Sequence, residues 1–130
     1  MANVKKITPE NAPPPAGHYS AGIVHNGIVY VSGQLARVPG QPASFAPPTI
    51  EEQTRQALAN AEAVLLAAGS RRDLVLRSTI YVSDIALWGA VNTEYSAFFG
   101  EHKPARAIVP VGKFKSGFLI EIDMIAAVAE

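Results

Sequence analysis

The stretch 118-FLIEIDMIAAVAE-130 has the period-2 alternation of a β-strand, with apolar residues pointing to both sides. One face would carry Phe118, Ile120, Ile122 and Met124, and the other Leu119 and Ile125. Glu121 interrupts this strand, and by the same alternation Asp123 shares its face. A carboxylate in such surroundings is desolvated, which raises its pKa and suits it to proton transfer. We therefore expect Glu121 to be paired with a cation or to take part in chemistry.

The preceding stretch, 103-KPARAIVPVGKF-114, predicts another strand over about 105–113, with Arg106 at its entrance. A guanidinium stays charged at any relevant pH and presents a fork that matches a carboxylate. Arg106 and Glu121 together indicate either a structural ion pair between two late strands or a site for an anionic substrate. The residues alone leave both interpretations open.

A hairpin is predicted towards the N-terminus, in 19-YSAGIVHNGIVYVSGQL-35. Its two apolar runs flank Asn26-Gly27, and both of these residues tolerate the positive φ of a tight hairpin turn. Ser32 and Gly33 are poor strand formers, and a glycine inside a strand often marks a bulge or a close approach to a ligand.

A helix is predicted over 49–69, since Thr49 and Glu52 form a capping box and Gly69 gives a C-terminal stop. Its apolar face is expected to comprise Ala57, Leu58, Ala61, Leu65 and Ala68. Residues 74–84 alternate as a strand. Asp84 can then cap a second helix over 85–100, whose buried stripe is expected to be Trp88, Val91, Tyr95 and Phe98.

The predicted order is β-β-α-β-α-β-β, an α+β fold with one mixed sheet and two helices on one face. Its 130 residues suggest a single domain spanning 1–130, with an extended arm at 1–17 and a proline-rich loop at 36–48. The strands at 28–35 and 118–128 are apolar on both faces, so we expect the uncovered face to pack against other subunits. The alternative is that the 36–48 loop covers it.

Composition excludes several classes of function. Eleven basic and eleven acidic residues give no net charge, which argues against nucleic-acid binding. The chain has no cysteine, so thiolate catalysis and Cys-based metal sites are excluded, and its three scattered histidines do not predict a metal site. No segment has the apolar core of a signal peptide or of a membrane span, so we expect a cytoplasmic protein.

The chain resembles the reactive intermediate deaminase family, also called YjgF or L-PSP. The resemblance is carried by 30-YVSGQ-34, 91-VNTEYSAFF-99, and above all 104-PARAIVPV-111 followed by 120-IEIDMIA-126. It implies a chorismate-mutase-like fold and a homotrimer, with sheets lining the centre and ligand sites between subunits. It also implies hydrolysis of enamines and imines such as 2-aminoacrylate and 2-iminopropanoate to 2-oxo acids and ammonia, as metabolite damage control, without a cofactor.

The resemblance also implies roles for individual residues. Arg106 would hold the substrate carboxylate, and Glu121 would hold and activate the attacking water. Tyr19 and Asn92 would line the cleft, Ser32 and Gly33 would shape its floor, and backbone groups near Gly33 and Ile108 would contact the substrate.

Ile108 stands where many members of the family have cysteine, and the F-F-x-x-x-K-P-A-R pattern is similar to the aminoacrylate deaminases of pyrimidine breakdown. Two alternatives therefore stay open. One is a pathway-specific deaminase acting on 3-aminoacrylate or an aminomuconate. The other is a ligand-binding or chaperone-like trimer without turnover.

Overall fold

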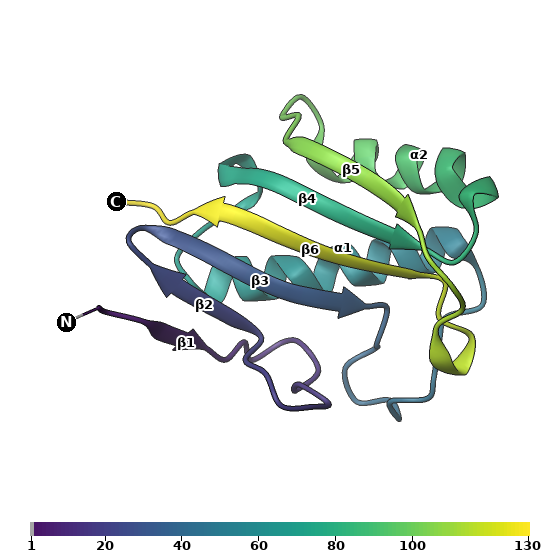
Figure 1. Ribbon diagram of the computed structural model, residues 1–130, viewed down its shortest axis with the longest axis horizontal. Coiled ribbons are helices and arrows are strands. Elements are labelled where there is room, and N and C mark those ends of the chain that lie inside the picture. Colours follow the sequence, from purple (N-terminus) through teal and green to yellow (C-terminus); the bar gives the residue numbers. More distant parts are fainter. Residues whose placement is uncertain (1) are drawn as a thin grey trace.

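The computed structural model describes residues 2–130 and shows a six-stranded mixed sheet with two helices (Figure 1). The strands are β1 (Lys5–Ile7), β2 (Gly22–His25), β3 (Ile28–Leu35), β4 (Val75–Val82), β5 (Ala105–Pro110) and β6 (Ile120–Ala127), and the helices are α1 (Ile50–Ala67) and α2 (Trp88–Phe99). Their order across the sheet is β1-β2-β3-β6-β4-β5, with β4 and β5 parallel and the other neighbours antiparallel. The predicted α+β class is confirmed, and the predicted elements occur in the predicted order after one additional strand, β1.

The sheet has one strand more than predicted. Residues 5–7 lie in the region expected to be an extended arm, but they pair with β2 as the edge strand β1. A short edge strand needs only backbone hydrogen bonds to one neighbour, so the local sequence carries little signal for it. The predicted strand 105–113 is also too long. It ends at Pro110, which cannot donate a ladder hydrogen bond and lies on the edge strand β5.

The predicted hairpin is confirmed, with Asn26 at φ 52° and Gly27 at φ 75° in its turn. Both residues are left-handed, as the type I′ turn that matches strand twist requires. The pairing of β3 with β6 shifts register between Val31 and Gln34. Gly33 therefore lies in the predicted bulge, which turns the end of β3 relative to β6.

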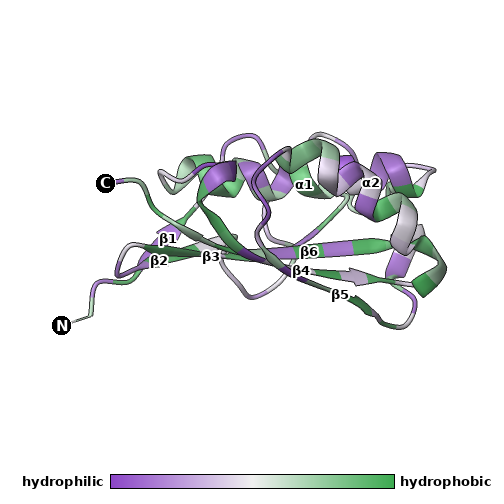
Figure 2. Cartoon of the chain, turned by 90° about the horizontal axis from the view of Figure 1, so that it is seen from above, coloured by the Kyte–Doolittle hydropathy of each residue, from purple (hydrophilic) through white to green (hydrophobic). Residues whose placement is uncertain are grey.

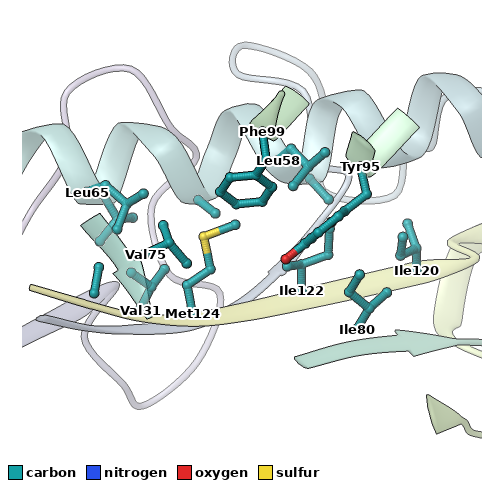
Figure 3. Packing of buried hydrophobic residues seen from close by; sticks show 14 of the residues in the cluster. Val31, Leu58, Leu65, Val75, Ile80, Tyr95, Phe99, Ile120, Ile122 and Met124 are labelled. Atoms are coloured by element: carbon teal, nitrogen blue, oxygen red, sulfur yellow. The ribbon is translucent and has the colours of Figure 1, made fainter. Parts of the chain in front are cut away.

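Helix α1 begins as predicted. The Thr49 hydroxyl accepts a hydrogen bond from the Glu52 backbone N–H at 3.2 Å, and Gly69 follows the helix at φ 81°. Both helices lie on the same side of the sheet (Figure 2). Their apolar faces meet the helix-facing side chains of the central strands. This interface includes Leu58 and Leu65 of α1, Ile80 of β4, and Ile120, Ile122 and Met124 of β6 (Figure 3). Each of these six is at most 1% exposed, so this interface is the core.

The predicted stripe of the second helix is partly wrong. Val91 and Tyr95 are buried, but Trp88 is 42% exposed and Phe98 is only partly buried. Phe99, four residues after Tyr95, takes the core position instead. Residues 85–87 form a 3₁₀ turn capped by Asp84, so Trp88 opens the α-helix at its outer end, away from the core.

Within residues 2–130, no helix covers the sheet face opposite α1 and α2 (Figure 2). Tyr30 is 48% exposed there and Val109 38%. The alternative in which the 36–48 loop covers this face is wrong. The loop packs beside α1, where Phe45 and Pro47 share a groove with helix side chains and Gln53 Nε2 donates to the Pro47 carbonyl at 2.9 Å.

Candidate functional site

Glu121 lies on the uncovered face of β6, at the wall of a small cavity of about 70 Å³. Tyr19, Gly33 and Glu121, three of the residues singled out from the sequence, line this cavity together. The walls are completed by prolines of the N-terminal arm and by the segment that follows β3. The fold therefore brings together residues that are about one hundred positions apart.

Gly33 is a glycine because Glu121 occupies the space where a side chain would be. A Cβ built on Gly33 would lie 2.8 Å from Glu121 Oε2 and 2.9 Å from its carboxyl carbon. The bulge of β3 thus brings its backbone directly against the carboxylate. A site that holds a water between a carboxylate and backbone groups requires an approach of this kind.

Ser32 has a different part from Gly33, because it holds the segment that carries Tyr19. Its hydroxyl donates to the Ser20 carbonyl at 2.6 Å, and its backbone N–H donates to the Ala21 carbonyl at 2.9 Å. The Tyr19 hydroxyl in turn accepts a long hydrogen bond from the Ala16 N–H at 3.3 Å. Ser32 is therefore fully engaged in shaping the cavity wall.

The electrostatics of Glu121 match the expectation from the sequence. Burial raises the pKa of its carboxyl above the ordinary glutamate value, and the carboxylate of Asp123 on the same face raises it further. Asp123 accepts a hydrogen bond from the Tyr81 hydroxyl at 3.0 Å, which raises the pKa of Tyr81. Among residues 2–130 no cation forms an ion pair with Glu121. Glu121 is thus poised to exchange a proton at higher pH than a solvated glutamate.

Arg106 lines a second, larger cavity of about 270 Å³ between β5 and α2. Its Nη1 donates to Asn92 Oδ1 at 2.8 Å, and its guanidinium carbon lies 4.9 Å from the Tyr95 ring centre and 5.5 Å from that of Trp88. These contacts orient the guanidinium without neutralising it. Ile108 lies two residues along β5 on the same face.

Arg106 and Glu121 do not meet within one chain. In the register of the sheet, Arg106 of β5 lies opposite Ser78 of β4, which is buried on the helix side. Glu121 of β6 lies opposite Tyr81 of β4, on the uncovered side. Strand β4 also separates β5 from β6, so the two backbones are about 10 Å apart, two strand spacings. The intrachain ion pair left open by the sequence is therefore excluded, and both charges remain available.

Two residues of the Glu121 cavity were missed from the sequence. Arg37 follows β3 in the proline-rich loop, and Asn60 is a buried polar residue of α1. Asn60 Nδ2 donates to the Leu35 and Arg37 carbonyls at 3.0 and 2.8 Å, which fixes the chain as it leaves β3. An asparagine at a position where the helix stripe is otherwise apolar was the available signal for such a contact.

No helix in the described range 2–130 has the length and apolar character needed to cross a membrane. The same range has no cluster of three or more histidine, aspartate or glutamate side chains with the geometry of a metal site.

Comparison with known proteins agrees with this architecture. The family described as "Endoribonuclease L-PSP" matches residues 9–128. The "2-iminobutanoate/2-iminopropanoate deaminase" of Escherichia coli (strain K12) is 36% identical over 94% of this chain and 96% of its own. A Yersinia pestis structure, described as "the Conserved Rid Protein Family YyfA", has a TM-score of 0.90 at 40% identity and covers 97% of this chain and 100% of its own.

A second solved structure, "E. coli TdcF with bound serine", has a TM-score of 0.89 at 29% identity, and covers 96% of this chain and 99% of its own. The family match extends over nearly the whole chain, and the relatives align from end to end. The chain belongs to the Rid (YjgF, endoribonuclease L-PSP) family.

Proposed function

We propose that this protein hydrolyses reactive imines and enamines of small 2-amino acids, giving a 2-oxo acid and ammonia, at sites shared between subunits of a homotrimer. The observation that carries the proposal is the pair of unneutralised charges, Arg106 and Glu121, in two cavities on opposite faces of one sheet. A substrate held by one of them can reach the other only on a neighbouring subunit. The relative named as an iminobutanoate and iminopropanoate deaminase supports this chemistry.

The uncovered sheet face supports the assembly. It exposes Tyr30 and Val109 together with partly buried Ile125, and apolar surface of this kind marks an interface. Three sheets that pack with these faces inward would bring the Glu121 side of one subunit next to the β5 edge of its neighbour. Arg106 and Asn92 would then come from one subunit, and Glu121, Tyr19 and Gly33 from the other.

The chemistry needs few groups, because the carbon of an imine is already electrophilic. Arg106 would bind the substrate carboxylate through its guanidinium fork, with Asn92 fixing its direction. Glu121 would accept a proton from water as the water oxygen bonds to the carbon of the protonated imine, giving a neutral carbinolamine. The same carboxyl group would then return that proton to nitrogen. As the C–N bond breaks and the C=O bond forms, the Glu121 carboxylate would accept the hydroxyl proton and pass it to the departing ammonia, which leaves as ammonium with the 2-oxo acid. The raised pKa of Glu121 suits this double role.

An enamine substrate requires one step more. A proton must be added to its terminal carbon before water can attack, which converts the enamine to the protonated imine. Glu121 is the half-buried acid in the cavity, and Tyr19 is the neighbouring hydroxyl. No redox step occurs, and water and protons balance the reaction.

The test is a competition assay. An amino-acid oxidase generates the imine in solution, semicarbazide traps it, and the protein competes by hydrolysing it first. Wild type is expected to suppress semicarbazone formation, and Arg106→Ala to lose that effect because the carboxylate is no longer held. Arg71→Ala is a matched control, since Arg71 is an exposed arginine whose partner is Asp73. If wild type fails to suppress trapping for any small imino acid, the proposal is refuted.

A further inference from the structure

The Glu121 cavity contains an arginine, Arg37, that the proposed reaction does not use. Arg37 lines this cavity, and its Nη1 donates to the Pro14 carbonyl at 2.9 Å. Its Nε is buried and has no hydrogen-bond partner within residues 2–130. No carboxylate in the same range lies within ion-pair distance of it.

The position of Arg37 is built rather than accidental. The Arg37 carbonyl accepts from Asn60 Nδ2 at 2.8 Å, and Asn60 is itself 1% exposed and receives a hydrogen bond from Gln56 at 2.9 Å. At the guanidinium end of the Arg37 side chain, the Pro14 carbonyl of the N-terminal arm accepts the hydrogen bond from Nη1. The guanidinium is thus fixed between α1 and the arm at the cavity wall.

Arg37 is half-buried and has no counter-ion within residues 2–130, and a partly desolvated charge without a counter-ion is costly. Glu121 does not serve as that counter-ion, because its pKa is raised, whereas a nearby paired guanidinium would lower it. Because no carboxylate of residues 2–130 neutralises Arg37, its guanidinium is available to an anionic group that enters the cavity. A cavity of about 70 Å³ has room for several atoms of a ligand, since a cavity of about 10–15 Å³ already holds one water.

We propose that Arg37 binds a second carboxylate of the substrate, so that the preferred substrates are imino or enamino acids of the dicarboxylic type. This inference rests on the proposed function, in which Arg106 of a neighbouring subunit holds the first carboxylate. The far end of the substrate then enters the Glu121 cavity, where the guanidinium of Arg37 offers a fork that a carboxylate fits. An apolar substrate end would leave the charge of Arg37 without a counter-ion.

Binding is tested first, with stable product analogues of equal chain length. The probes are 2-oxoglutarate, which has two carboxylates, and 2-oxopentanoate, which has one, each measured by calorimetry. Wild type is expected to bind 2-oxoglutarate at least about 10-fold more tightly than 2-oxopentanoate, because one charge-assisted contact contributes about that much. Arg37→Met is expected to lose this preference, Arg37→Lys to regain part of it, and Arg71→Met, at an exposed arginine, to behave as wild type.

Turnover is tested with the same variants. The imine of glutamate and that of norvaline are generated by oxidases, and the ratio of their hydrolysis rates is compared. The ratio is expected to fall about 10-fold or more in Arg37→Met. Size-exclusion chromatography shows whether each variant keeps its assembly.

The outcomes separate the two proposals. Equal binding of both probes by wild type, or an unchanged ratio in Arg37→Met, overturns the role of Arg37 even if both imines are hydrolysed. A change in assembly without a change in preference overturns it as well, because Arg37 would then be an interface residue. Selective binding of 2-oxoglutarate without hydrolysis of either imine refutes the proposed function and leaves Arg37 as a carboxylate-binding residue.

Discussion

Gly33→Ala is expected to impair catalysis far more than stability. The added Cβ would lie 2.8 Å from Glu121 Oε2, whereas ordinary contacts begin near 3.4 Å. The difference, 3.4 − 2.8, requires the carboxylate to move by about 0.6 Å. A glutamate side chain can make this shift by leaving its preferred rotamer, at about 1 kcal/mol. For a domain of this size that is a decrease in Tm of only about 3–5 °C.

The same shift removes the carboxylate from the position in which it would hold the water. A displacement approaching 1 Å in a catalytic group costs up to about 100-fold, so we expect kcat/KM to fall about 10- to 100-fold. The assay is semicarbazide competition together with thermal unfolding. Gly112→Ala is the control, since a Cβ there meets no atom within 4 Å and the residue has no positive φ. Full activity in Gly33→Ala would refute the reasoning, as would a variant that unfolds.

Three further results are expected. Asp123→Asn removes a negative charge that raises the pKa of Glu121. The acid limb of the kcat/KM–pH profile, where activity appears as the Glu121 carboxylate forms, should therefore move to lower pH. An acid limb at the wild-type pH would contradict this. Asn92→Asp places a carboxylate beside Arg106 at the position of the present 2.8 Å hydrogen bond, so KM should rise about 10-fold or more in steady-state kinetics, and an unchanged KM would show that the guanidinium does not bind substrate. Thr49→Ala removes the N-cap of α1 and should cost about 1 kcal/mol in denaturant unfolding with kcat/KM unchanged, and a loss of activity would mean that this end of α1 serves the site.

Features with a local cause could be predicted from the sequence. The Asn26-Gly27 turn and the Thr49 cap each depend on residues within three positions of one another, and both are present. Asp84 also acts as a cap, but it caps the 3₁₀ turn before α2 and not α2 itself. Trp88 shows the limit of this reasoning. The helical period places it on the apolar face, but its exposure depends on where α2 begins relative to the core, which is a tertiary property.

The candidate site divides in the same way. The sequence alone was enough to single out Arg106 and Glu121, because a charged side chain in an apolar strand requires an ion-pair partner or a functional role. That they lie on opposite faces of the sheet could not be predicted, since it depends on the register of β4 with both β5 and β6. Arg37 gave no signal in the sequence, because an arginine in a polar loop is ordinary until the fold buries its Nε.

The claim that the site is shared between subunits is tested most directly by mixing two variants. Arg106→Ala and Glu121→Gln are each expected to be inactive alone. Denatured together in equal amounts and refolded, they should regain about one quarter of wild-type activity, because random closed assembly pairs an intact Arg106 with a neighbour's intact Glu121 at about one interface in four. Arg106→Ala mixed with the double variant is the control that should stay inactive. A mixture of the two single variants that stays as inactive as each variant alone would contradict the account.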